Sequence, residues 1–446
     1  MTTQTLVKNI LNTKYEDIPD EVIEHAKKSI KNWAGVTIGA AYHPSVEMVL
    51  ELKKDLQSGE QVSILGREEK VDLLLATLTN GMSSHIFDFD DTHLDTIHHP
   101  SGPVAPVVFA LGEHLDLDTK ELIRAFTLGC ETELRLSNAV YPSHYDLGWH
   151  ITSTAGVIGA AVAAGLLLNL EEEKMTYAIG IAATQASGLR EMFGTMTKPF
   201  HPGKAAQNGL LATLLAEKGF TSSTQAIEAK RGFAAVLAPE HDLSRVNENW
   251  GQQWELQKNA FKPYACGIVL HPSIDACIKL KEYAKPEEVK EIKITVNPYV
   301  LELTGKPTPK TGLEGKFSIY HSATIGFLEG DAGENQYKDE VVNRQDVIDF
   351  RSKINPTVDE TMEEDKAVAT LILKSGETHT VNIEHATGSI KNPMTNDHLN
   401  HKFNKLVAPI IGKENSQKLI ENLDNLDNVS SIKDIVELCA TKKVLV

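Results

Sequence analysis

The segment His85–Gly102, HIFDFDDTHLDTIHHPSG, concentrates side chains that can carry protons or bind metal ions. Its titratable members are Asp88, Asp90, Asp91, Asp95, His85, His93, His98 and His99. Such groups are costly to pack against apolar neighbours unless they are solvated or functional. The segment therefore predicts either a solvated acidic loop that caps the next helix or a functional site.

Three kinds of functional site fit these residues. Aspartate and histidine can bind a metal ion. Asp90, Asp91 and Asp95 resemble a DDxxxD pattern that binds magnesium and diphosphate, but the sequence shows no second acidic motif to complete that site. A carboxylate and a histidine can also act together as acid and base on a C–H or C–O bond.

The composition limits the partners of the protein. The formal net charge is -17, which argues against binding to nucleic acid or to an anionic membrane surface. The sequence shows no GxGxxG motif after a strand and no P-loop, so we expect no redox or nucleotide cofactor. A small anionic substrate is still compatible with this net charge, because a few lysine or arginine side chains in a pocket can outweigh the repulsion from a distant negative surface.

The cysteines and apolar segments indicate a cytoplasmic protein. The four cysteines form no CxxC pair, so we expect reduced thiols and no zinc or redox motif. The first residues lack the basic and apolar regions of a signal peptide. The longest apolar run, Ala155–Leu168, is shorter than the roughly 18–20 residues that span a bilayer. We expect it to be a buried helix at the centre of a helical core.

Hydrophobic periodicity predicts two kinds of domain. Helical spacing prevails up to about residue 265 and again from residue 392. Between them, Val289–Val296 alternates as a strand does, and Val368–Leu373 and Thr378–Ile383 flank a turn at Ser375-Gly376. The sequence therefore predicts a mainly α protein with a helical domain at 1–265, an inserted α+β domain at 266–391, and helices at 392–446 that return to the first domain.

Several blocks together resemble the MmgE/PrpD family, which contains 2-methylcitrate dehydratase, cis-aconitate decarboxylase and iminodisuccinate epimerase. The resemblance rests on blocks that keep the family order: His85–Gly102, Ser143–Gly156, Gly194–Gly203, Phe261–Tyr264, Thr311–Ser318 and Asn392–Met394. It implies a large helical domain, a smaller α+β lid with the active site between them, and a homodimer.

The resemblance also implies which residues line the site. They are Asp88, Thr92, His99, His150, Lys198 and Lys262. His99 directly precedes Pro100 and is preferred over His98, which stays the alternative. His201, in the block Gly194–Gly203, and Tyr320, just after the block Thr311–Ser318, are further candidates for substrate binding.

The reactions of this family need acid–base groups and cations but no metal. Decarboxylation, dehydration and epimerisation all move a proton near neutral pH, which histidine can do. We expect His99 and His150 to exchange the proton and Asp88 to orient one of them. Thr92 would donate to a substrate carboxylate, while Lys198 and Lys262 would bind the carboxylates of a small di- or tricarboxylate.

One position departs from the family pattern. In the run Phe317–His321, His321 stands where a tyrosine is expected in the decarboxylase and dehydratase branches. His321 could be an alternative proton donor, or the reaction could differ. The motif TKPFHPG, at 197–203, is closer to the decarboxylase and epimerase branches, so itaconate formation from cis-aconitate is the first hypothesis.

Other readings of the sequence remain open. The reaction could be that of a 2-methylcitrate dehydratase or of an iminodisuccinate-type epimerase. A metal-dependent hydrolase or diphosphate lyase would contain a bound divalent metal, whereas the acid–base lyase would keep its activity after chelation. A non-catalytic carboxylate-binding protein would be stabilised by its ligand without turning it over.

Overall fold

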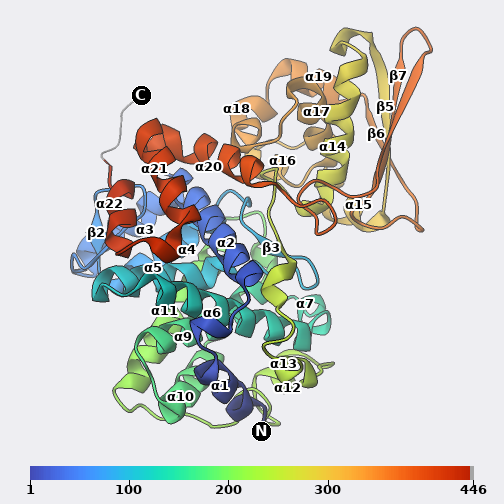
Figure 1. The fold of residues 1–446 in the computed structure, drawn as a ribbon. Helices are drawn as coiled ribbons and strands as arrows, with labels where there is room; N and C mark the ends of the chain where they lie inside the picture. Colours follow the sequence, from blue (N-terminus) through green and yellow to red (C-terminus); the bar gives the residue numbers. More distant parts are fainter. Residues whose placement is uncertain (442–446) are drawn as a thin grey trace. The chain divides into compact units, whose positions relative to one another are not determined.

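The computed structural model describes residues 1–441, which divide into two compact units. The first unit contains residues 1–86, 90–259 and the chain from Leu399 onward (Figure 1). The second contains Phe87–Phe89 and Ala260–His398. Residues 442–446 of the predicted C-terminal segment lie outside the described residues.

The first unit is built almost entirely of helices. Its longer helices are α1 (Thr2–Asn12), α2 (Asp20–Gly39), α3 (Pro44–Asp55), α4 (Leu73–His85), α5 (Ser101–Leu115), α6 (Thr119–Val140), α9 (Gly156–Leu167), α10 (Glu172–Ala183), α11 (Thr197–Glu217), α21 (Lys413–Asp424) and α22 (Ile432–Cys439). Short helices are α7 (Ser143–Asp146), α8 (Ile151–Thr154), α12 (Phe233–Leu237) and α13 (Ser244–Asn247). A small antiparallel pair joins β1 (Val62–Ser63) to β2 (Lys70–Val71).

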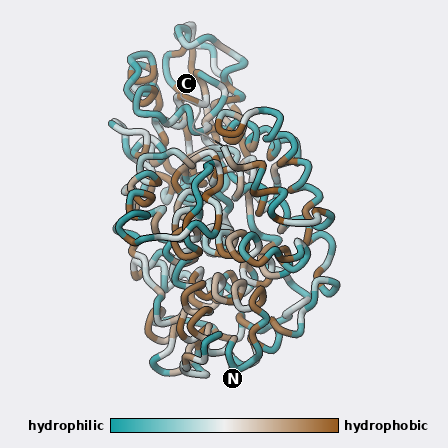
Figure 2. Tube along the Cα trace, turned by 90° about the vertical axis from the view of Figure 1, so that its left-hand side faces the viewer, coloured by the Kyte–Doolittle hydropathy of each residue, from teal (hydrophilic) through white to brown (hydrophobic). Residues whose placement is uncertain are grey.

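Helix α9 is the centre of this unit. Each of its residues is buried, and it packs against α5, α6, α10 and α11. The predicted buried helix is thereby confirmed. Close packing depends on its small residues, because a Cβ built on Gly159 would lie 2.3 Å from Oε2 of Glu133 on α6. Hydrophobic colouring marks the packed helices near the N-terminal label in Figure 2.

The helix starts follow local chemistry. The Asp118 side chain accepts a hydrogen bond from the Lys120 amide and caps α6, a position at which aspartate is favoured. The hydrophobic pattern of residues 203–218 predicts a helix that begins at Gly203, but α11 begins earlier, at Thr197. Pro199 lies in the first turn, where its missing N–H costs nothing. Lys198 and His201 are therefore helical residues one turn apart, on one face of α11.

The second unit contains a four-stranded mixed sheet in the order β6-β5-β7-β8. Its strands are β5 (Val289–Val296), β6 (Ile354–Val358), β7 (Ala367–Leu373) and β8 (Thr378–Ile383). Strand β5 pairs parallel with β6 and antiparallel with β7. The predicted strand at 289–296 and the predicted hairpin are both confirmed.

Helices complete the second unit. They are α14 (His271–Leu280), α15 (Pro298–Thr304), α16 (Gly312–Gly315), α17 (Ile319–Glu329), α18 (Asp339–Val342) and α19 (Gln345–Arg351). Helix α14 packs against β7, β8 and α17, which makes this an α+β unit. The predicted fold class, a large helical domain with a smaller α+β domain, is confirmed. Helix α20 (Asn396–Ile411) contains the boundary at 398/399. Across residues 1–441, no helix combines the length and the apolar character that a membrane crossing requires.

Candidate active site

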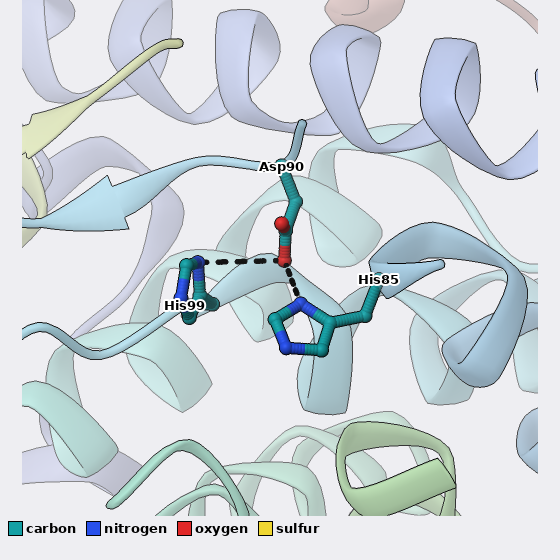
Figure 3. Close-up of side chains that lie close together, drawn as sticks. All are labelled: His85, Asp90 and His99. Atoms are coloured by element: carbon teal, nitrogen blue, oxygen red, sulfur yellow. Dashed lines mark hydrogen bonds and ion pairs between the residues drawn. The ribbon is translucent and has the colours of Figure 1, made fainter. Parts of the chain in front are cut away.

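Two histidines of the first unit share the carboxylate of Asp90. His85 is the last residue of α4, and its Nδ1–H donates to Asp90 Oδ2 over 2.6 Å. His99 precedes α5, and its Nδ1 lies 3.5 Å from the same oxygen. Figure 3 shows the two rings on different sides of the carboxylate, and all three residues are buried. A shared carboxylate can stabilise positive charge on either ring.

His99 is surrounded by oxygen atoms at Nδ1. That nitrogen lies 2.8 Å from the Asp91 carbonyl oxygen and 3.2 Å from Thr92 Oγ1. Nδ1 therefore carries the proton of the neutral ring, and Nε2 holds the acceptor lone pair. Thr92 thus contacts His99, one of the two histidines expected to move the proton.

The alternative histidine, His98, belongs to the helical core. Its Nδ1 contacts Ser137 Oγ at 2.8 Å, and its Nε2 lies 3.4 Å from Glu133 Oε1. Burial lowers the pKa of His98 well below its usual range and raises the pKa of Glu133 well above its usual range. The geometry therefore favours His99 over His98 as the reacting histidine.

A second pair of histidines extends this cluster. His150 Nδ1 lies 2.9 Å from His201 Nδ1, so one of these nitrogens carries a proton and donates it to the other. The His150 ring stacks at 5.8 Å from the His85 ring. Burial, reinforced by nearby His85, lowers the pKa of His201 to about 4 and that of His150 well below its usual range. Both rings are neutral at neutral pH.

Lys198 adds a cation beside this pair. It is buried, with Nζ 5.1 Å from the centre of the Phe193 ring. Its charge also lowers the pKa values of His150 and His201, which places the ammonium group within electrostatic reach of both rings. A substrate carboxylate at this lysine would lie close to neutral imidazoles.

Asp91 anchors the loop that carries the site. Its Oδ2 accepts hydrogen bonds from Ser101 Oγ and from the Asn259 side-chain amide, each at 2.5 Å. Burial, with a further contribution from nearby Asp90, raises the pKa of Asp91 to about 7. Asp91 thus connects the start of α5, through Ser101, and the last residue of the segment 90–259, through Asn259, to the loop beside His99.

In the second unit, Asp88 pairs with Lys262. Lys262 Nζ donates to the Asp88 carbonyl oxygen over 3.0 Å and to Oδ1 over 3.2 Å. Both side chains are buried. Asp88 was expected to orient a histidine; the carboxylate that contacts His85 and His99 is that of Asp90, which the sequence analysis did not select. The sequence alone does not show which aspartate faces the histidines. Asp88 has a left-handed backbone with φ of 52°, so the side chains of this loop do not follow a regular spacing.

Lys316 is a further residue that the sequence analysis did not single out. Its Nζ donates to the Phe87 carbonyl oxygen and to Glu334 Oε2, both over 2.5 Å, and the side chain is buried. Burial raises the pKa of Glu334, and the charge of Lys316 opposes that rise. The only signal in the sequence was its place in the block Thr311–Ser318 that resembles the family.

His321 is fully enclosed in the second unit. Its Nε2–H donates to the Gln336 carbonyl oxygen over 3.0 Å, and an Arg351 guanidinium N–H faces Nδ1 at 3.3 Å. Burial lowers its pKa to about 4. Both ring nitrogens are occupied, which favours a structural role. Tyr320 is half-buried on the same helix.

Among residues 1–441, two clusters have ligand atoms close enough for one metal ion. In the first, one atom each of His85, Asp90 and His99 lies within 4.8 Å of the others. The 2.6 Å contact between His85 and Asp90 is the length of a hydrogen bond, which a bound ion would have to replace. The second cluster is His93, Asp95 and Glu255. The Lys258 Nζ lies 3.0 Å from an Asp95 carboxylate oxygen and 2.9 Å from a Glu255 carboxylate oxygen. Its ammonium group therefore already neutralises these two carboxylates.

Comparison with known proteins covers nearly the whole chain. The MmgE/PrpD N-terminal domain matches residues 4–246, and the MmgE/PrpD C-terminal domain matches residues 264–428. A cis-aconitate decarboxylase of Aspergillus terreus is 26% identical over 92% of this chain and 90% of its own length. The cis-aconitate decarboxylases of Mus musculus and Homo sapiens are each 27% identical over 94% of this chain and cover 89% and 90% of their own lengths. The chain belongs to the MmgE/PrpD family.

Proposed function

We propose that this protein is a metal-independent carboxy-lyase that converts cis-aconitate to itaconate. The observation that carries the proposal is the buried set of imidazoles around Asp90, with Lys198 beside His150 and His201. Such a set can deliver a proton and hold a carboxylate without redox chemistry. The relatives named as cis-aconitate decarboxylases support this substrate over others of the family.

The reaction needs one bond cleavage and one proton. The C–C bond to the carboxyl group on the methylene carbon breaks, and CO₂ leaves. The electron pair enters the adjacent double bond, which shifts, and the far carbon takes a proton. Lys198 is proposed to bind one carboxylate and to stabilise negative charge as it develops. Thr92 is proposed to donate a hydrogen bond to another carboxylate of the substrate.

His99 is the proposed proton donor and His150 its partner. Asp90 can stabilise an imidazolium at His99. His150 is held neutral by burial, so it can accept a proton or orient a substrate oxygen. His201 fixes the tautomer of His150 through their shared hydrogen bond.

The test is proton NMR of the EDTA-treated protein in D₂O with cis-aconitate, 2-methylcitrate or iminodisuccinate. We expect itaconate with one deuterium at the methylene carbon that took the proton, at a rate that chelation does not change. Dehydrated methylcitrate would identify the dehydratase reaction, and exchange at a substrate C–H would identify the epimerase reaction. Loss of activity on chelation, restored by a divalent metal, would contradict metal independence. Thermal stabilisation by all three compounds without turnover would indicate a non-catalytic carboxylate-binding protein.

We also propose a cytoplasmic homodimer. The cysteines Cys130, Cys266, Cys277 and Cys439 are free and buried, which suits a reducing compartment. Large apolar side chains are exposed in the first unit at Leu147, Leu189 and Met196, and backbone pairing of Trp149 with Leu189 links two of these segments. Light scattering should give twice the chain mass of 49.0 kDa, and Leu189→Glu should shift it toward the monomer.

A further inference from the structure

His85 has an imidazole nitrogen that the described part of the chain leaves without a hydrogen-bond partner. The residue is only 1% exposed, and its Nε2 has no acceptor or donor among residues 1–441. Leaving a buried polar atom unsatisfied costs about 1–3 kcal/mol. Native proteins avoid that cost by placing a water molecule or a ligand at such atoms.

The other ring nitrogen of His85 is firmly held. Nδ1–H donates to Asp90 Oδ2 over 2.6 Å, and this contact fixes both the orientation and the tautomer of the ring. In the neutral ring the proton sits on Nδ1, so Nε2 presents a lone pair. A carboxylate behind one nitrogen and an open lone pair on the other is the arrangement by which proteins prepare histidine for proton transfer.

The surroundings of His85 place it inside the proposed site. Its ring centre lies 4.7 Å from that of His99, edge to face, and 5.8 Å from that of His150, nearly parallel. A positive charge on His85 would lower the pKa values of His150 and His201, which places the ring within electrostatic reach of both. His85 is thus the central ring of the cluster, between the two histidines chosen from the sequence.

We propose that His85 is a catalytic residue that transfers a proton at Nε2 to or from the substrate, and that Asp90 is its positioning residue. This inference rests on the proposed lyase function. In this assignment the one proton of the decarboxylation comes from His85 in place of His99: the Nε2–H bond of the His85 imidazolium breaks, and a C–H bond forms at the far carbon. Asp90 stabilises the imidazolium beforehand, and solvent returns the proton after the product leaves. Because Asp90 also contacts His99, the two rings share one counter-ion, so a proton on one disfavours a proton on the other.

The kinetic test compares His85→Gln and Asp90→Asn with a matched control. The control, His144→Gln, changes a buried histidine of the same unit whose two nitrogens are both occupied, by the Leu237 carbonyl oxygen and by Thr154 Oγ1. We expect His85→Gln to lower kcat roughly 100- to 10,000-fold with KM changed less than about threefold. Asp90→Asn should lower kcat roughly 10- to 100-fold, and Asp90→Glu should restore part of it. The control should stay within about threefold of the wild type.

A folded His85→Gln variant with wild-type kcat would overturn the proposal. If that variant does not fold, Asp90→Asn decides, because it keeps the imidazole and removes only the charge; unchanged kcat in Asp90→Asn would then overturn the dyad. A binding experiment separates this inference from the proposed reaction. Histidine labelled at Cε1 with ¹³C is observed by NMR during titration with tricarballylate, and the His85 signal is assigned by its loss in His85→Gln. We expect that signal to shift whether or not the wild type converts cis-aconitate, and a His85 signal that does not move would contradict contact with the substrate.

Discussion

Adjacent histidines in the first unit have different surroundings and should respond differently to substitution. His98 contacts Ser137 and Glu133 inside the helical core, whereas His99 lies against Asp90 and Thr92. We expect His98→Gln to lower the free energy of unfolding by about 1–3 kcal/mol and to leave kcat within about threefold. His99→Gln should instead lower kcat roughly 100- to 10,000-fold. Urea unfolding and itaconate formation measure the two effects, and the reverse pattern would assign the reaction to His98.

His321 tests the departure from the family pattern. Its two ring nitrogens contact the Gln336 carbonyl oxygen and Arg351, so we expect His321→Gln to lower the free energy of unfolding by about 1–3 kcal/mol. The kcat should stay within about threefold, because no nitrogen is left to carry a proton to the substrate. Denaturant titration and the itaconate assay check this. A large loss of kcat at unchanged stability would return His321 to the catalytic residues.

At the scale of elements, two lysines hold one short segment of the second unit. Lys262 and Lys316 donate to the successive carbonyl oxygens of Asp88 and Phe87. Asp88 has a left-handed backbone, which a non-glycine residue adopts only when its surroundings enforce it. These lysine contacts contribute to that enforcement.

We therefore expect Lys316→Met to increase amide hydrogen exchange in the segment Phe87–Phe89 by roughly tenfold. Glu334→Gln should give a smaller increase, because Lys316 stays but loses its counter-ion. The matched control is Lys281→Met, an exposed lysine of the same unit whose Nζ donates to the Leu328 carbonyl oxygen. Mass spectrometry of the peptides that cover residues 84–92 measures the effect, and equal exchange in Lys316→Met and the control would show that Lys316 does not hold the segment.

Elements were predictable where one pattern dominates. Strand β5 alternates apolar and polar residues from Ile292 to Val296, so the strand follows from the sequence, although its pairing with β7 is irregular between Val289 and Glu291. The start of α11 does not follow from the sequence alone, because two prolines obscure it: Pro199 lies in the first turn, which tolerates proline, and Pro202 lies inside the helix. The candidate site shows the same contrast. The selection of His99, His150 and Lys198 as site residues follows from motifs that resemble the family. The contacts of Asp90 with His85 and His99, where Asp88 was expected, depend on backbone dihedral angles, which residue spacing does not encode.

At the scale of the whole molecule, buried neutral histidines make the first unit sensitive to acid. Burial lowers the pKa values of His25 and His144 to about 4, and it lowers those of His98 and His150 well below their usual range. Each imidazole is then protonated in the unfolded chain below about pH 6.5. In the folded protein the His25 and His144 rings stay neutral until near pH 4, and the lowered pKa values of His98 and His150 act in the same direction. Between these values the unfolded state binds more protons at these histidines. Their contribution to the free energy of unfolding therefore falls as the pH falls from about 6.5 toward 4, while the raised pKa values of Asp91 and Glu133 act in the opposite direction.

His144→Gln isolates one of these protons. His144 Nδ1–H donates to the Leu237 carbonyl oxygen, and its Nε2 accepts from Thr154 Oγ1, so protonation would break the second bond. One such group contributes up to about 1.4 kcal/mol per pH unit between pH 6 and 5. The variant should be less stable than the wild type at pH 7 but should lose stability less steeply on acidification.

Urea unfolding at pH 7, 6 and 5 measures this slope through tryptophan fluorescence, since Trp33, Trp149, Trp250 and Trp254 all lie in the first unit. His398→Gln, an exposed histidine of the second unit, is the control. Parallel slopes for the wild type and His144→Gln would mean that His144 does not couple folding to pH.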